Sequence, residues 1–329
     1  MKRGSALRRV PASQPMQLAE VGATESDVCV FELSPEAGAI TIEATSGRAL
    51  VIAPGDRFLG TAGHRESTRW VVGTLPQGGL IPGSDYWILA DCGVAGTYLG
   101  DSPREKGHLG QVRFVGTMQD AAGAALNLRQ FALRPVSSTD HGAPAFLVLG
   151  TSAEVGKTTA AIGVLCALRR SGKTRIVALK ATGTSSLTEL HSYQDFGAAP
   201  CFDCVDFGLP TTYPSDREDI GALFDTMLDA CLSIPSDAVL IECGGDVLGA
   251  NVPAFLSRLV ARRPNVRVIL AASDALAALG AKSVLAGMHL TPSLITGPCT
   301  DTPTIERRTR ELCGIPAMNL AKRGAAVPF

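Results

Sequence analysis

The sequence has no apolar run long enough to cross a bilayer and no excess of charge of either sign. A membrane-spanning helix needs about 20 consecutive apolar residues, and no stretch of the chain has them. Lysine and arginine number 30 against 31 acidic residues, so no basic field favours nucleic acid or an anionic membrane. Residues 1–17 are basic but lack the apolar segment of a secretory signal. We therefore expect a cytoplasmic protein without a membrane or nucleic-acid partner.

The nine cysteines lack the paired spacing of a disulfide framework. Their number is odd, and several lie inside apolar runs, where a free thiol packs as a small apolar group. Cys201 and Cys204 form one CxxC, with His191 upstream. A structural zinc site uses four ligands, and no second pair has a suitable spacing. The pattern therefore favours buried thiols in a reducing compartment over a zinc site.

The hydrophobic pattern changes along the chain, whose 329 residues suffice for two domains of about 100–200 residues each. Residues 1–25 are predicted to be a flexible leader. Residues 26–135 contain short β-branched and aromatic runs separated by glycine, proline and aspartate. These runs predict a small, mainly-β barrel or sandwich of about six strands. Residues 136–144, with serine, glycine and proline, predict a linker.

In residues 145–329, apolar strands alternate with segments of helical periodicity. The expected strands are 145–150, 175–180, 238–243, 266–273, 293–297 and 315–320, and the expected helices are 158–172, 219–233, 252–263, 275–288 and 304–314. This alternation predicts an α/β domain whose parallel sheet is covered by helices on both faces. Ligands in such sheets bind at the carboxyl ends of the strands, so the residues just after each strand are the candidate site.

The first of these strands runs into the loop GTSAEVGKTT, residues 150–159. Gly150 and Gly156 allow a positive φ and a close approach of a ligand oxygen, and the helix that follows offers free N–H groups and a positive dipole end to an anion. Lys157 can reach the β- and γ-phosphates, and Thr158 can bind Mg²⁺. The loop predicts ATP and Mg²⁺ as cofactors. The expected nucleotide-binding residues are Gly150, Thr151, Ser152, Val155, Gly156, Lys157, Thr158 and Thr159.

The loop has the spacing G-x5-G-K-T, and it resembles the phosphate loop of dethiobiotin synthetase, GTDTEVGKT. The two loops differ at Ser152 and Ala153. The same spacing occurs in the related cobyrinate amidases, and a related loop occurs in two-domain proteins linked to D-glutamate N-acetylation. The resemblance covers residues 146–320. It implies an α/β, three-layer P-loop NTPase domain, here preceded by the small mainly-β domain.

Further residues of the site come from the same resemblance. Lys180, in LKATGTSS, matches a lysine that helps to hold the carbamate and the phosphate, although the proline that follows that lysine is absent here. Glu242, in AVLIECGGD, resembles a metal-binding glutamate. A third acid is expected in a helix after the lysine strand. Asp195 is the preferred metal ligand there, with Asp203 and Asp206 as alternatives.

The resemblance implies an ATP- and Mg²⁺-dependent ligase or kinase that phosphorylates a carboxylate or carbamate of a small molecule. Lys157, Lys180 and Glu154 are the expected catalytic residues, and Glu154 is expected to face the amine or hydroxyl of the acceptor. One alternative is a GTPase or metallochaperone-like switch, although the base-recognition motif N-K-x-D is missing from the sequence. Another is an amino-acid N-acyltransferase whose loop binds the diphosphate of a CoA ester. Under each of these hypotheses, the β domain is expected to serve as a lid, a specificity module or a homodimer surface.

Overall fold

The computed structural model describes residues 1–67, 70–102, 110–134, 139–214 and 217–322. By its internal contacts the chain divides into two units. Unit 1 comprises residues 1–133, 184–188 and 203–215, and unit 2 comprises residues 134–183, 189–202 and 216–329. Two short segments from the second half of the chain thus belong with the N-terminal unit, which the expected division into consecutive domains did not include.

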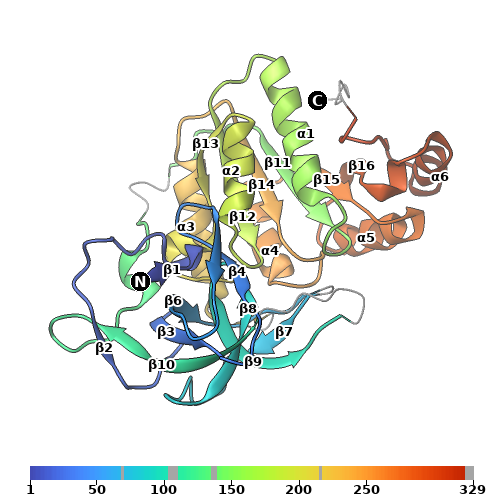
Figure 1. Ribbon diagram of the computed structural model, residues 1–329. Coiled ribbons are helices and arrows are strands. Elements are labelled where there is room, and N and C mark those ends of the chain that lie inside the picture. The colour runs from blue at the N-terminus through green and yellow to red at the C-terminus, as the bar shows by residue number, and fades with distance from the viewer. Residues whose placement is uncertain (68–69, 103–109, 135–138, 215–216, 323–329) are drawn as a thin grey trace. The chain divides into compact units, whose positions relative to one another are not determined.

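Unit 1 is built on a closed β-barrel (Figure 1). Strands pair in the order β6–β3–β10–β8–β9, and β9 pairs with β6 in parallel, so five strands complete a ring. The barrel interior is filled by apolar side chains, among them Phe31, Phe58 and Phe114. The strands of this unit are β1 (Lys2–Arg3), β2 (Gln17–Ala19), β3 (Val28–Leu33), β4 (Ile40–Glu43), β5 (Ala49–Ile52), β6 (Arg57–Ala62), β7 (Val72–Thr74), β8 (Asp85–Ala90), β9 (Val94–Gly100) and β10 (Gln111–Gln119).

The predicted flexible leader is wrong for the first part of the chain. Lys2 and Arg3 form β1, which pairs with β6, and the short helix η1 (Ser5–Leu7) is fully buried. Arg8 then donates hydrogen bonds of 2.6 and 2.7 Å to the carboxylates of Asp203 and Asp206. The basic residues that suggested a solvated leader are therefore partly used as ion-pair partners inside unit 1.

Arg8→Met is expected to lower the free energy of unfolding by about 2–3 kcal/mol, because it leaves two buried carboxylates without their cation. The side chains of Asp203 and Asp206 are only 1% and 10% exposed. Urea denaturation measures the loss. Arg57→Met is the matched control, since Arg57 and Glu32 form a pair that is 52% and 30% exposed, and such pairs contribute about 0–1 kcal/mol. Equal losses in the two variants would contradict a structural role for Arg8.

Unit 2 is a parallel sheet with the strand order β13–β12–β14–β11–β15–β16. Its strands are β11 (Ala145–Gly150), β12 (Ile176–Thr182), β13 (Ala198–Phe202), β14 (Ala238–Cys243), β15 (Arg267–Ala271) and β16 (Pro292–Thr296). All residues of β11, β12 and β14 are buried, as expected for central parallel strands that are covered on both faces. The predicted α/β fold class is confirmed, and β13 was not predicted.

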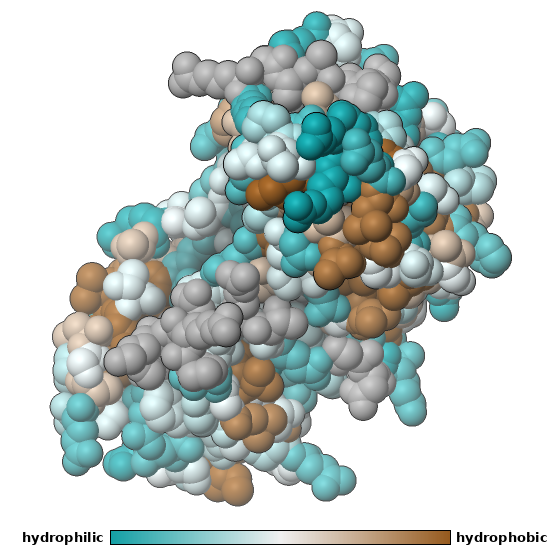
Figure 2. Space-filling model, turned by 90° about the vertical axis from the view of Figure 1, so that its right-hand side faces the viewer, coloured by the Kyte–Doolittle hydropathy of each residue, from teal (hydrophilic) through white to brown (hydrophobic). Residues whose placement is uncertain are grey.

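Helices cover the sheet: α1 (Lys157–Arg170), α2 (Leu187–Asp195), α3 (Ile220–Leu232), α4 (Val252–Arg262), α5 (Ala275–Gly287) and α6 (Pro303–Cys313). Helices α1 and α2 cross the sheet in the foreground of Figure 1, α3 packs against α4, and α5 packs against α6. The predicted strand 315–320 is reduced to one parallel bridge between Ile295 and Ala317. The side of the molecule where α6 lies faces the viewer in Figure 2 and shows a dense hydrophilic area beside smaller hydrophobic ones.

The remaining expectations about the chain's organisation concern the linker and the cysteines. Of the predicted linker, residues 139–144 contain no helix or strand, whereas 136–138 lie outside the described residues. All nine cysteines are free thiols, and seven of them are buried. In the part of the chain that is described, no helix has the length and apolarity needed to cross a membrane.

Candidate functional site

The phosphate-type loop connects β11 to α1 at the carboxyl edge of the sheet in unit 2. Strand β11 ends at Gly150, and α1 begins at Lys157 after Gly156, whose φ is +83°. Thr151 fastens the start of the loop to the end of β15, since its N–H donates to the Ala271 carbonyl (3.0 Å) and its hydroxyl accepts from the Ser273 N–H (3.3 Å). The start of the loop is thus fixed by the backbone and side chain of Thr151.

Lys157 is folded back beneath the loop. Its ammonium donates to the Ser152 carbonyl oxygen at 2.7 Å, and its aliphatic chain crosses directly over Gly150. A Cβ at Gly150 would meet the Lys157 Cδ at 2.7 Å, so no larger residue fits at that position without moving the lysine. Burial, aided by the charge of Lys180, lowers the pKa of Lys157 below its usual value. The loop therefore holds a desolvated cation that gains from an anionic partner.

Glu154 differs from Lys157 in both exposure and backbone conformation. It is exposed and adopts a φ of +59°, in the left-handed region. Few residues other than glycine adopt this conformation, and those that do often lie at functional sites. This left-handed residue lies within a loop that is one residue longer than the common G-x4-G-K spacing. The acid and the lysine of the loop consequently have different surroundings.

Glu242 is the centre of a buried hydrogen-bond network beside the loop. It is 1% exposed. Its Oε1 accepts from the Thr158 hydroxyl and from the Lys180 ammonium, both at 3.1 Å, and its Oε2 accepts from the Tyr193 hydroxyl at 2.7 Å. The strand register explains the meeting, because Glu242 on β14 lies opposite Val148 of β11 and Lys180 of β12.

Lys180 has a second carboxylate partner, Glu189, in the first turn of α2. Burial opposes the charge of Lys180, but Glu189 and Glu242 outweigh it and raise the pKa of Lys180 above its usual value. Partial burial raises the pKa of Glu189 in spite of the adjacent ammonium. The Lys180 side chain is 6% exposed, that of Glu242 is 1% exposed, and that of Glu189 is 30% exposed. Glu189 is thus the acid of this network that solvent reaches.

The structure does not bring the expected third acid, Asp195, into this network. Asp195 is exposed at the last residue of α2, six residues after Glu189 and therefore about 9 Å farther along the helix axis. The alternatives Asp203 and Asp206 pair with Arg8 in unit 1. The metal role expected for Asp195 is therefore not carried forward, because its carboxylate lies at the end of the helix away from Lys180.

Sequence reasoning missed Glu189 and Tyr193. They are four residues apart, so they lie on the same face of α2, and the carboxylate of the first and the hydroxyl of the second reach Lys180 and Glu242, respectively. The available signal was position: Glu189 is the first acid after a strand whose last residues include the candidate lysine. The weak helical pattern of residues 187–195 hid that signal.

The connection after β14 packs against the end of β12 through glycine. Gly244 donates its N–H to the Thr182 carbonyl, and a Cβ at Gly244 would meet that oxygen at 2.4 Å. Farther along, the Asp246 carboxylate accepts from the N–H groups of Leu248 and Gly249, both at 2.8 Å. Asp246 thus closes a turn after β14.

The arrangement of the strand, the glycine-bounded loop, the buried lysine and the helix decides the fold of unit 2. This is a parallel α/β fold with a phosphate-type loop between its central strand and the first helix. No family model matches the chain, and no curated protein matches it. Among solved structures it is similar to FtsY from Mycoplasma mycoides, with a TM-score of 0.36 and 15% identity over 58% of this chain and 64% of that chain. It is also similar to a ParA family ATPase from Chlorobium tepidum TLS, with a TM-score of 0.33 and 11% identity over 54% of this chain and 83% of that chain. Likenesses of this size carry nothing about substrates or partners.

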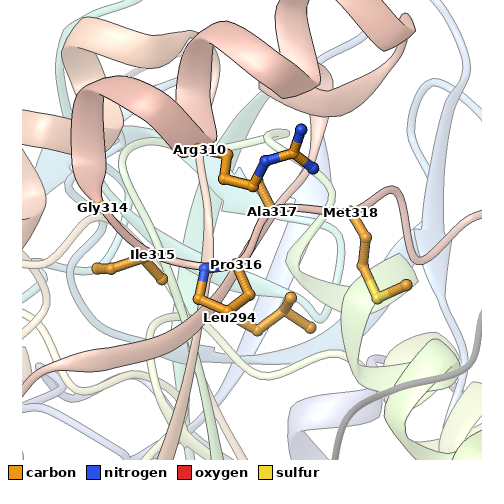
Figure 3. Close-up of a pocket in the computed structure, with 7 residues that line it drawn as sticks. All are labelled: Leu294, Arg310, Gly314, Ile315, Pro316, Ala317 and Met318. Atoms are coloured by element: carbon orange, nitrogen blue, oxygen red, sulfur yellow. The ribbon is translucent and has the colours of Figure 1, made fainter.

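A cavity of about 440 Å³ lies apart from the loop, between α6 and residues 314–318. Leu294, Ile315, Pro316, Ala317 and Met318 contribute apolar surface, and Arg310 is the charged residue among the described ones that line it (Figure 3). The cavity borders β16, which is separated from the loop strand β11 by β15. None of the residues predicted for the site lines it.

Proposed function

We propose that unit 2 binds a nucleoside triphosphate with Mg²⁺ and transfers its terminal phosphoryl group to a carboxylate or carbamate of a small molecule. One observation carries the proposal: the buried Lys157 lies beneath the glycine-bounded loop, and the next residue, Thr158, contacts Glu242. This combination supplies a cation, free helix N–H groups and oxygen ligands at one place. ATP is the preferred nucleotide because the loop resembles that of an ATP-dependent ligase.

The anion-binding part of the proposal depends on the start of α1. The first N–H groups of a helix lack internal partners and carry a partial positive charge. Lys157 adds a full positive charge. Its side chain is already buried in the fold, so the lysine has lost most of its contact with water before a ligand binds. A diphosphate that enters the loop would accept from these groups, and Lys157 would exchange the Ser152 carbonyl for a phosphate oxygen. Such charge-assisted hydrogen bonds are stronger than neutral ones.

The residues beside the loop fit Mg²⁺. This ion prefers oxygen ligands and retains several waters, so it needs only one or two protein ligands beside the phosphates. The Thr158 hydroxyl and the Glu242 carboxylate, 3.1 Å apart, would hold it, directly or through water. The ion would neutralise charge on the transferring phosphoryl group. Within the described residues, no set of three or more His, Cys, Asp and Glu side chains forms a metal site independent of a nucleotide.

Phosphoryl transfer would form a bond between an acceptor carboxylate oxygen and the γ-phosphorus and break the bond from that phosphorus to the leaving diphosphate. The mixed anhydride would then be open to attack by an amine, which releases phosphate. Lys180, at the end of β12, is the residue that we assign to the acceptor's charge. Glu154, exposed on the loop, is assigned to the amine or hydroxyl of the acceptor.

Titration calorimetry with ATP, GTP and acetyl-CoA, each with and without Mg²⁺, tests the proposal. The expected result is ATP binding that Mg²⁺ strengthens. Acetyl-CoA binding that is independent of Mg²⁺ would favour the acyltransferase alternative, because a CoA diphosphate needs no metal for the chemistry. GTP binding with turnover that needs no small-molecule acceptor would favour the switch alternative. Either result would overturn the ligase or kinase assignment.

Glu154→Gln is expected to leave ATP affinity within about twofold and to raise the KM of an amine or hydroxyl acceptor by roughly tenfold, the effect of one lost charge-assisted hydrogen bond. The change keeps the shape of the side chain and its left-handed backbone. Calorimetry gives the first quantity, and coupled phosphate release with a panel of carboxylic acids and amines gives the second. If ATP affinity falls as far as it does in Lys157→Ala, Glu154 faces the nucleotide instead.

A further inference from the structure

We propose that the Glu189 carboxylate competes with the acceptor for Lys180. In the absence of acceptor it pairs with the Lys180 ammonium, at the position that the acceptor carboxylate takes on binding. This inference rests on the proposed function, since it names the partner of the acceptor's charge within the same site. It goes further in assigning a role to a residue that the phosphate-loop chemistry does not need. Glu189 would act through Lys180 and would be a gating residue.

The two carboxylates on Lys180 are held very differently. Glu242 is 1% exposed, and it also accepts hydrogen bonds from Thr158 and Tyr193. Moving it would break three hydrogen bonds in a buried place, where each unsatisfied group is costly. The Glu189 side chain is 30% exposed and begins in the first turn of α2. The Glu189 side chain therefore already borders water, and we take Glu189 as the partner that exchanges.

Lys180 is positioned to receive a substrate carboxylate. It lies near the carboxyl end of β12, paired in register with Glu242 of β14, and Glu242 contacts Thr158 directly after the loop lysine. The charge of Lys180 contributes to the lowered pKa of Lys157, so the two ammonium groups lie close enough to interact. An anion that bridges the loop and β12 would thus meet Lys180 once Glu189 moves.

The exchange has a low electrostatic cost. One carboxylate replaces another on the same ammonium, so Lys180 and Glu242 are never left as an uncompensated buried charge. Because of this competition, the apparent affinity for the acceptor equals the intrinsic affinity multiplied by the fraction of time that Glu189 is away from Lys180. Removing the charge of Glu189 is therefore expected to strengthen anion binding, whereas loss of an ordinary binding residue would weaken it.

The experiment measures malonate binding by NMR titration at constant ionic strength, with neutral malonamide as the control ligand. Glu189→Gln is expected to tighten malonate binding roughly tenfold, a coupling of ordinary size, and to leave malonamide unaffected. The matched variant is Glu306→Gln, because Glu306 is also an acid in the first turn of a helix, with a side-chain exposure of 26%. It is expected to change neither ligand. The comparison is repeated in Lys157→Ala, so that binding at the loop does not contribute.

The gain must depend on Lys180. Glu189→Gln combined with Lys180→Met is expected to lose it, and Glu189→Gln combined with Lys180→Arg, which keeps the cation and is the safer variant for folding, is expected to retain it. Unchanged or weaker malonate binding in Glu189→Gln, or an equal gain in Glu306→Gln, would overturn the inference. If Glu189→Gln does not tighten malonate binding while ATP still binds with Mg²⁺, the inference fails and the proposed function stands. If Glu189→Gln tightens malonate binding but no nucleotide binds, the inference stands and the proposed function fails.

Discussion

Lys157→Ala is expected to weaken binding of ATP with Mg²⁺ at least about 100-fold and to abolish turnover. A charge-assisted hydrogen bond contributes about 1.5–3 kcal/mol, and the upper value corresponds to two powers of ten in affinity. The upper value applies because the ammonium is buried beneath the loop, where water does not screen it. Titration calorimetry of the variant with ATP and Mg²⁺ measures the loss.

This loss can be separated from a loss of folding. Burial lowers the pKa of Lys157, which means that the fold disfavours its charged form relative to water. Replacing it by alanine is therefore expected to change the unfolding midpoint little, although the Ser152 carbonyl loses a donor. Lys173→Ala is the matched control, since Lys173 is exposed just beyond the end of α1. ATP affinity in Lys157→Ala within fivefold of that in Lys173→Ala would exclude the loop as the nucleotide site.

The fold of unit 2 was predictable because its central strands are buried on both faces. AVLIEC reads as an uninterrupted apolar strand with an acid near its end, and β14 spans Ala238–Cys243 as expected. The parallel arrangement then requires that strand ends meet at one edge, so the ends of β12 and β14 were expected beside the loop, whereas Lys180 and Glu242 themselves were selected from the resemblance to dethiobiotin synthetase. The contacts of Glu242 with Lys180 and Thr158 depend on register, which the buried strands fix strongly.

The barrel of unit 1 was harder to predict because glycine interrupts the strands that close it. Strands β6 and β9 pair with each other, and each contains a glycine where another backbone approaches. A Cβ at Gly60 would meet the Gly93 carbonyl oxygen at 2.4 Å, and one at Gly96 would meet the Gly63 carbonyl oxygen at 2.8 Å. Glycine weakens the strand signal at the places where closure requires it.

Contacts between distant segments were not accessible from one sequence. The partners of Arg8 lie 195 and 198 positions farther along the chain, and Glu43 caps the N–H groups of Leu187 and Thr188 at 2.9 and 2.7 Å. Local patterns describe residues 1–10 as basic and polar, and only the folded unit supplies the carboxylates that make burial possible. The same limit explains why Asp195 was selected and Glu189 was missed, because spacing along the chain does not reveal where α2 begins.

Lys180→Met is expected to lower the free energy of unfolding by about 3–5 kcal/mol, the usual cost when one partner of a buried ion pair is removed. Glu242 would keep its hydrogen bonds from Thr158 and Tyr193 but would lose its cation at 1% exposure. Glu189, whose side chain is 30% exposed, is expected to contribute little to this loss. Urea denaturation followed by circular dichroism gives the value, provided that the slope of the transition stays unchanged.

The control for the loss of stability in Lys180→Met is the same substitution at a lysine whose partner is uncharged. Lys282 donates to the Cys313 carbonyl at 2.7 Å, and Lys282→Met is expected to cost only about 1 kcal/mol. Adding Glu242→Gln to Lys180→Met removes the stranded charge and is expected to recover part of the stability, since the two residues are in direct contact and their effects are not additive. A loss in Lys180→Met no greater than in Lys282→Met, or a double variant less stable than Lys180→Met, would show that Glu242 does not need its cation. Lys180 would then be free to serve an anionic ligand alone, and the stability of the network would depend on Tyr193 and Thr158.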